Sequence, residues 1–276
     1  MLKLIKMDLY RLFSSKFIKV GAIMAALVAV LYMLLSLGIV ALTKMALRED
    51  PSVAEGLGTF FSQATWYFGV DFAEIVFQGT STTALCLFIG CMIAANFIGS
   101  EQSCGYTKNF AGQLPNRGYM AISKFISTSV AQVLIFVIYI IISALCAKLM
   151  FGKYITGYAI PSLFAALGLR LMLHLAINAI IIFLCTLTKS HAIAMVAGCI
   201  FGLGITHLAY LAIGMILSTL KINFGIANYM PDGINSLLLG LHNSTEVVVK
   251  TIIVSLSFIA VFLTANYFIS KKRDVR

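Results

Sequence analysis

The residues of this sequence best suited to chemistry are Arg170, His174 and Asn178, which lie together in one long apolar stretch. They are spaced four apart, so a helix would place all three on one face. Such a polar strip can line a route for cargo or gate it. It can equally be a buried network that locks neighbouring helices together, and Asn96 or Gln132 on nearby apolar stretches could complete either arrangement.

The sequence lacks the groupings that would indicate an enzyme or a metal site. HExxH, GxSxG and the phosphate-binding pattern GxxxxGK[ST] do not occur, and no paired carboxylates lie within the apolar runs. The four histidines are scattered without metal-ligand spacing, and the six cysteines include no CxxC pair. We therefore expect no catalytic residue, no metal and no cofactor in this chain.

Composition identifies the class of protein that must hold these residues. Of 276 residues, 61% are hydrophobic and only 11% are charged, whereas soluble domains carry roughly 25% charged residues. A chain with this much apolar surface is expected to be an integral membrane protein. Its net charge of +10 does not indicate nucleic-acid binding, because no basic patch with interleaved aromatic residues stands apart from the apolar runs.

Six apolar stretches reach or approach the roughly 20 residues that cross about 30 Å of hydrocarbon. They predict one all-α, polytopic membrane domain covering residues 1–276, with no soluble domain between the spans. The predicted spans are Val20–Leu42, Ser81–Gly99, Val130–Ala147, Ser162–Leu187, Ala192–Leu217 and Thr251–Ile269. Arg170 then lies roughly 13 Å into the fourth span at 1.5 Å per residue. A charge at that depth must face protein or a watery cavity.

Residues 1–16 predict an amphipathic helix that lies on the membrane surface. They do not read as a signal peptide, because the apolar run that follows is too long and no small-x-small cleavage site follows it. On a helical wheel, the apolar face consists of Leu2, Ile5, Leu9, Leu12 and Phe13.

The distribution of charge predicts that both termini are cytosolic. With that orientation, lysine and arginine concentrate in the N-terminal helix, between the second and third spans and at the C-terminal end, whereas acids concentrate in the outer loops. The net charge is then a property of the cytosolic surface. The expected location is the cell membrane.

Residues 100–118 form a polar cytosolic insert between the second and third spans. Gly105 permits a sharp change of direction, and Pro115 ends the short helix expected between them. An apolar stripe at i, i+4 and i+8 is formed by Tyr106, Phe110 and Leu114. A stripe of this kind needs a surface that covers it, either the membrane interface or a groove in another protein.

In these features the chain resembles the ABC type-2 transporter permeases, which include bacitracin, lantibiotic-immunity and peptide-toxin exporters. The family shares an amphipathic N-terminal helix, six spans and a first cytosolic loop with an acid, a glycine and then Pro-x-Arg. The matching residues are Glu101, Gly105, Pro115 and Arg117, followed by Lys124 at the start of the next helix. After the glycine this chain has Tyr-Thr-Lys-Asn-Phe, where the family usually has a threonine-leucine run.

The resemblance implies that the insert carries a coupling helix, which docks in a cleft of a separate ATPase subunit that binds ATP and Mg. The residues expected at that contact are Glu101, Gly105, Tyr106, Phe110, Leu114, Pro115 and Arg117. Six spans are half the usual complement of such an exporter, so a second permease subunit, identical or different, is also implied.

Small residues spaced by four could serve that permease dimer, or could pack helices within one subunit. They are Gly21, Ala25 and Ala29 in the first span and Ala194, Gly198 and Gly202 in the fifth.

The leading functional expectation is therefore the membrane subunit of an ATP-driven exporter, with amphipathic or antimicrobial peptides as cargo. In it, Arg170, His174 and Asn178 belong to the translocation path. The alternative is a secondary transporter or channel that uses Arg170 and His174 as an ion or proton site, although the sequence shows no convincing internal repeat.

Overall fold

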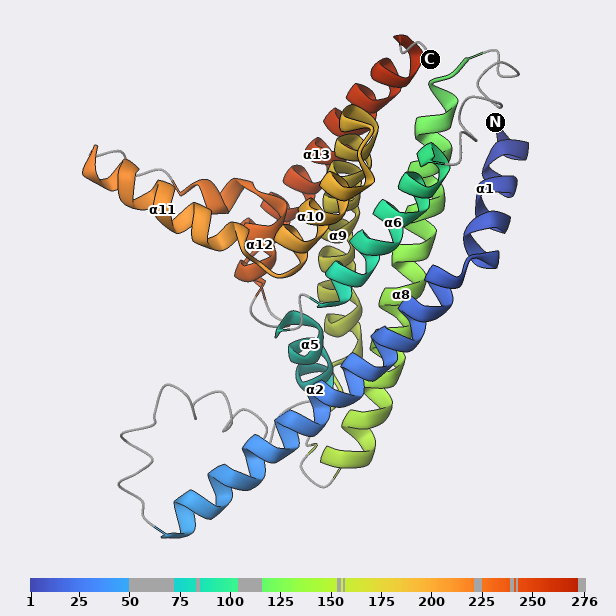
Figure 1. Ribbon diagram of the computed structural model, residues 1–276. Coiled ribbons are helices and arrows are strands. Elements are labelled where there is room, and N and C mark those ends of the chain that lie inside the picture. The colour runs from blue at the N-terminus through green and yellow to red at the C-terminus, as the bar shows by residue number, and fades with distance from the viewer. Residues whose placement is uncertain are drawn as a thin grey trace.

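Every element of regular structure in the described part of the chain is a helix. The structure is a computed structural model (Figure 1), and it describes residues 1–49, 72–82, 85–103, 116–152, 155, 157–220, 225–238, 241 and 243–272. The elements are α1 (Leu2–Ser14), α2 (Lys16–Glu49), α5 (Phe72–Thr82), α6 (Leu85–Ser103), α8 (Tyr119–Phe151), α9 (Ile160–Thr188), α10 (His191–Gly202), α11 (Thr206–Thr219), the 3₁₀ turn η1 (Ile226–Tyr229), α12 (Pro231–Leu237) and α13 (Thr245–Lys272).

Four of the described helices are long and apolar enough to cross a membrane. They are α8, α9, α13 and the Lys16–Gly38 part of α2. The predicted third, fourth and sixth spans fall within these helices, and the predicted first span, Val20–Leu42, overlaps Lys16–Gly38. The all-helical class is therefore confirmed for the described residues, and these long apolar helices fit a polytopic membrane protein.

The predicted second and fifth spans differ from what the structure contains. The apolar part of α6, Leu85–Glu101, is shorter than the other four. The stretch predicted as Ala192–Leu217 is broken into α10 and α11, whose axes differ by 71°. Gly204 lies at the break with a positive φ of 70°, a conformation that glycine adopts without steric cost. The structure thus shows four spans, or five if the bent pair is one span, within the described residues.

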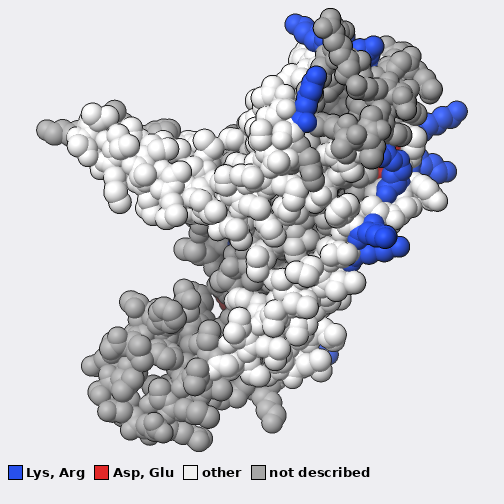
Figure 2. Space-filling model, viewed as in Figure 1, with Lys and Arg blue, Asp and Glu red and all other residues white. Residues whose placement is uncertain are grey.

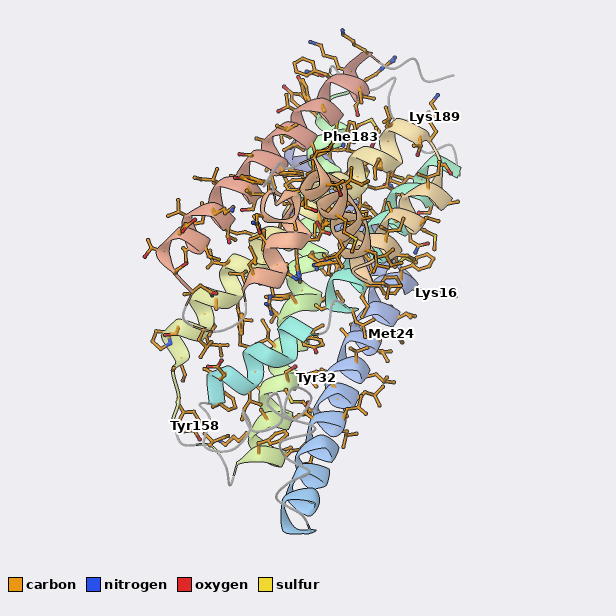
Figure 3. The ribbon with its side chains drawn as sticks, turned by 90° about the vertical axis from the view of Figure 1, so that its left-hand side faces the viewer. Lys16, Met24, Tyr32, Tyr158, Phe183 and Lys189 are labelled. Carbon is orange, nitrogen blue, oxygen red and sulfur yellow. The ribbon has the colours of Figure 1, made fainter. Side chains whose placement is uncertain are left out.

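The long helices pack side by side in a tilted bundle, and α11 projects from its side (Figure 1). The main pairings are α9 with α13, α10 with α6, and α2 with α8. Helix α9 runs the length of the bundle, between Tyr158 at one end and Lys189 at the other (Figure 3). Lys189 takes a left-handed conformation, and the Ser190 side chain caps α10, so α9 reverses into α10 within two residues.

Both ends of the chain lie at the same end of the bundle (Figure 1). Lysine and arginine side chains gather at that end and along the side where α1 lies, whereas the middle of this face carries almost none (Figure 2). The predicted topology places this basic end of the bundle in the cytosol, and that orientation stays a prediction.

The N-terminal segment forms a helix of its own, α1, and one side of it is buried against the rest of the chain. An extended Ser15 separates α1 from α2, and α1 packs on α8. The side chains that α1 buries are Leu4, Asp8 and Leu12, whereas Leu2 and Phe13 of the predicted apolar face are exposed. Position on a membrane surface stays a prediction.

Candidate functional site

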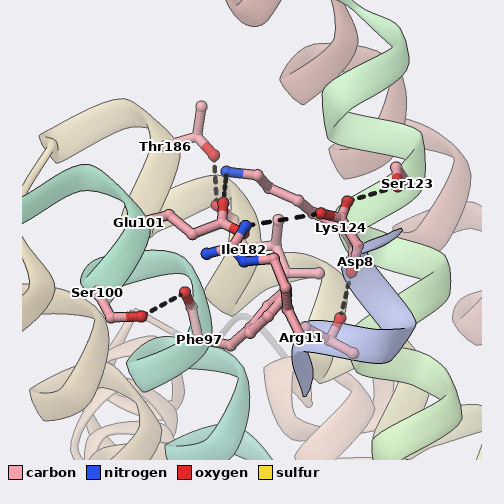
Figure 4. Close-up of polar contacts among 10 residues, drawn as sticks. Asp8, Arg11, Phe97, Ser100, Glu101, Ser123, Lys124, Ile182 and Thr186 are labelled. Atoms are coloured by element: carbon pink, nitrogen blue, oxygen red, sulfur yellow. Dashed lines mark hydrogen bonds and ion pairs between the residues drawn. The ribbon is translucent and has the colours of Figure 1, made fainter. Parts of the chain in front are cut away.

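A buried cluster of charged side chains joins three helices at the end of the bundle that carries the termini (Figure 4). We call it the Glu101 cluster. Its members are Asp8 and Arg11 from α1, Glu101 from α6, and Ser123 and Lys124 from α8.

Glu101 is the centre of the cluster, and its side chain is 0% exposed. Arg11 Nη1 donates a hydrogen bond to Oε1 of Glu101 at 2.8 Å, and Lys124 Nζ forms an ion pair with Oε2 (Figure 4). Each carboxylate oxygen therefore has a cation from a different helix. A buried charge needs such partners, because removing it from water costs several kcal/mol.

Asp8 supplies the second acid of the cluster and fixes α1 against α8. Its Oδ2 accepts a hydrogen bond of 2.6 Å from the Ser123 hydroxyl, and its Oδ1 lies 3.9 Å from Arg11 Nη1. Two acids and two bases balance within the cluster. Burial raises the pKa of the Asp8 carboxyl above its ordinary value of 3.8, and neighbouring Glu101 acts in the same direction, while Ser123, Lys124 and Arg11 oppose the shift.

The cluster sits where the chain leaves α6 for the polar insert. Glu101 lies in the last turn of α6, and the described chain resumes at Asn116, just before α8. There Asn116 Nδ2 donates a hydrogen bond of 2.6 Å to the Tyr267 hydroxyl of α13, and Asn116 Oδ1 accepts one from the Gly118 amide. A Cβ at Gly118 would collide with the Tyr267 ring. Both ends of the insert are therefore fixed to the bundle.

Most of the predicted coupling residues fall outside this description. Gly105, Tyr106, Phe110, Leu114 and Pro115 lie outside the described residues. Arg117 is described and half-buried at the start of α8. Of the two predicted coupling residues that the structure describes, Glu101 and Arg117, Glu101 is a member of the cluster.

Sequence reasoning missed Asp8 and Arg11 as members of a site. The available signal was that Asp8 is the first acid of the chain, set in a basic helix and spaced four from Leu4 and Leu12. This spacing puts an acid on a buried face, and Arg11 three residues later is its natural partner.

The predicted polar strip is buried between helices. Arg170 is 0% exposed, and His174 and Asn178 are nearly as buried. Asn178 Nδ2 donates to Thr128 Oγ1 of α8 at 3.0 Å, and His174 Nδ1 lies 3.5 Å from Gln132 Nε2, also of α8. Gly90 of α6 allows this contact to form, because a Cβ there would collide with the Gln132 side chain.

Arg170 extends the strip to two shorter helices. Its Nη2 donates a hydrogen bond of 3.0 Å to the Leu238 carbonyl, just beyond the end of α12. Its guanidinium also lies 4.4 Å from the ring centroid of Phe77 in α5, a distance typical of a cation–π interaction. These contacts fit the buried-network alternative; a role in a translocation path stays a prediction. Asn96 Nδ2 donates a hydrogen bond of 2.9 Å to the Met92 carbonyl of its own helix.

The small residues predicted for dimer packing are used inside the chain. Gly21, Ala25 and Ala29 are buried in α2, and a Cβ at Gly21 would press on Ile93 of α6. In α10, Gly198 faces Cys91 and Gly202 faces Phe88, both of α6, and Ala194 is buried. These contacts fit the alternative of packing within one subunit; a role of these residues in a dimer stays a prediction.

Comparison with known proteins adds no identification. The sequence matches no protein-family model and shows no significant match to a curated protein. The residues and their geometry therefore carry the functional argument.

Substitution of Glu101 tests whether the cluster stabilises the fold as a unit. Glu101→Gln keeps the shape of the side chain but leaves Lys124 buried without a counter-charge, so we expect a loss of about 3–5 kcal/mol in the free energy of unfolding. A thiol-reactive dye can report unfolding, because Cys86, Cys91 and Cys185 are buried. Glu101→Gln combined with Lys124→Met should lose less than the sum of the two single variants.

Glu246→Gln is the matched control, because this exposed glutamate lies in the first turn of α13, at the end of that helix opposite the C-terminus. It should change the melting temperature little. A double variant whose loss equals the sum of the singles would show that Glu101 and Lys124 do not act as a pair.

The raised pKa of Asp8 predicts that the stability of the fold depends on pH. Because its pKa is raised in the fold, the native state binds a proton more tightly than the unfolded chain. Stability should therefore fall as pH rises from 3.8 through the raised pKa, and level off above it. Asp8→Asn removes this contribution, so its melting temperature should decline less over that window.

Ser123→Ala should raise the pKa of Asp8 further. It removes the hydrogen bond that favours ionised Asp8, so the decline should extend to higher pH. Melting curves between about pH 4 and 8 would measure both variants. A pH profile for Asp8→Asn that parallels the wild type would contradict the assignment.

Proposed function

We propose that this chain is the membrane-spanning permease subunit of an ATP-driven exporter of the ABC type-2 kind. In this proposal it moves amphipathic or antimicrobial peptides out of a bacterial cell. ATP and Mg bind to a separate ATPase subunit, since the chain contains no GxxxxGK[ST] pattern. A second permease subunit completes the complex.

The observation that carries the proposal is the attachment of the insert at both ends. Glu101 ties the start of the insert to α1 and α8, and Asn116 ties its end to α13. A loop that only connected two spans would need no such anchors. A loop that receives force from another protein does need them, because force is passed on only through contacts that hold their geometry.

The proposed mechanism follows from these contacts. A displacement of the insert acts on the ends of α6 and α8 together, because Glu101 and Lys124 are paired. Arg11 extends the displacement to α1. The chain would then respond to ATP binding and hydrolysis as a connected set of helices, the usual manner in which packed helices change state.

In the same proposal the polar strip lines the route only when α8 and α9 separate. The contacts of Asn178 with Thr128, and of His174 with Gln132, close this interface in the structure. Opening it would expose polar groups that can solvate a cargo. The strip would thus serve as a closed gate.

One observation favours the alternative of a secondary transporter. Discontinuous spans are typical of such proteins, and the α10–α11 pair is bent by 71°. Arg170 and His174 would then form the ion or proton site. Transport that follows an ion gradient without an ATPase subunit would favour this alternative.

The insert offers the sharpest test of the exporter. We expect Tyr106→Ala combined with Phe110→Ala to weaken binding of the ATPase subunit and to abolish cargo-stimulated hydrolysis, because aromatic anchors commonly contribute about 2 kcal/mol or more each at an interface. Membrane insertion should be unaffected. Co-purification and an ATPase assay measure the two effects.

Tyr158→Ala combined with Phe164→Ala is the matched control, since both aromatics are exposed near the start of α9, at the end of that helix opposite Lys189. This control should bind and stimulate the ATPase subunit as the wild type does. If the Tyr106 and Phe110 variant binds and stimulates the ATPase subunit as the wild type does, the coupling role is wrong. The apolar stripe is then assigned to the membrane surface instead.

A further inference from the structure

A groove of about 490 Å³ lies beside the Glu101 cluster, where α1, α2 and α6 meet. Its walls combine two basic side chains with apolar ones. The residues that define it are Arg11, Lys16, Phe17, Val20, Phe97 and Ser100.

The break between the first two helices creates the groove. Ser15 is extended, with φ −70° and ψ 145°, and its hydroxyl donates to the Leu12 carbonyl at 2.7 Å. The chain therefore turns between α1 and α2 instead of continuing as one helix. Phe97 and Ser100 of α6 form the opposite wall.

The groove has both charged and apolar walls. Arg11 and Lys16 supply positive charge, and Arg11 is held in place by its hydrogen bond to Glu101 and lies 5.9 Å from the ring centroid of Phe97. Phe17 and Val20 follow Lys16 on α2, with Val20 about 6 Å farther along the axis at 1.5 Å per residue. A suitable ligand thus has an anionic head and an apolar tail.

The apolar side of the groove is open to the surroundings of the bundle. Phe17 is 51% exposed and Val20 is 56% exposed, and both begin the Lys16–Gly38 span. In a membrane these side chains face lipid acyl chains. Lys16 projects from the same helix at the start of this stretch (Figure 3).

We propose that this groove binds an anionic phospholipid, with its phosphate between Arg11 and Lys16 and an acyl chain along Phe17, Val20 and Phe97. Basic pockets between membrane helices recognise lipid head groups in this way. A free phosphate would use only the basic end and leave the apolar walls uncovered. The bound phosphate contacts the guanidinium that holds Glu101, so the lipid also stabilises the Glu101 cluster.

Lipid retention by the purified full-length chain tests the charge requirement. Native mass spectrometry with phosphatidylglycerol should show tighter binding than with phosphatidylcholine. Lys16→Gln should weaken phosphatidylglycerol binding about fivefold, the effect of one basic residue on an anionic lipid. Lys19→Gln is the matched control, because Lys19 is exposed on the same helix and does not line the groove. Equal affinity for both lipids, or equal losses in the two variants, would overturn the proposal.

A second pair of variants tests the acyl-chain requirement without changing charge. Val20→Trp fills the apolar part of the groove and should abolish preferential binding of phosphatidylglycerol. Ile23→Trp, at an exposed position one turn farther along α2, should not. Inorganic phosphate should not displace the lipid. Displacement by inorganic phosphate, with Val20→Trp still binding phosphatidylglycerol as the wild type does, would show a phosphate site and overturn the lipid assignment.

Discussion

A single buried carboxylate, that of Glu101, imposes the strongest constraint on the described structure. It is fully removed from solvent, and a charge in that position is tolerated only with well-placed opposite charges. Arg11 and Lys124 supply those charges from two different helices. Neutralising Glu101 therefore requires α1 to lie against the bundle and α6 to end beside α8. The attachment of the insert and the shape of the neighbouring groove both depend on this arrangement.

Polar contacts also determine which helices pack together in the middle of the bundle. Apolar side chains distinguish poorly between a neighbouring helix and lipid, so close backbone approach and hydrogen bonds must set which helices meet. Gly90 lets α6 approach the Gln132 side chain of α8, and Asn178 joins α9 to α8 through Thr128. Arg170 then attaches α12 through the Leu238 carbonyl. Among the described residues, polar contacts thus join helices both near the insert and within the spans.

The sequence predicted what local patterns determine, and it could not predict long-range pairing. The fourth span was expected at Ser162–Leu187, and α9 covers Ile160–Thr188, because a proline and a long apolar run mark this helix clearly. The break at Gly204 was missed because the apolar run continues through it. Glu101 was singled out from the pattern of the insert. Its partner Arg11 lies 90 residues earlier, where no spacing rule applies.

The small residues of α2 and α10 show the same limit. Their spacing predicted close helix packing, but spacing alone does not tell whether the partner helix belongs to the same chain. In the structure, Gly21 of α2 and Gly198 and Gly202 of α10 pack against α6 of the same chain.

Hydrogen–deuterium exchange in α1 tests the central claim most directly, because α1 is held to the bundle by the charges around Glu101. The account predicts that amides of Leu2–Ser14 exchange faster in a Glu101→Gln protein than in the wild type, while those of Ile160–Thr188 keep their protection. Equal exchange of Leu2–Ser14 in the two proteins would show that α1 is held by its other contacts, such as the Ser123–Asp8 hydrogen bond and apolar packing, and would contradict the central role of Glu101.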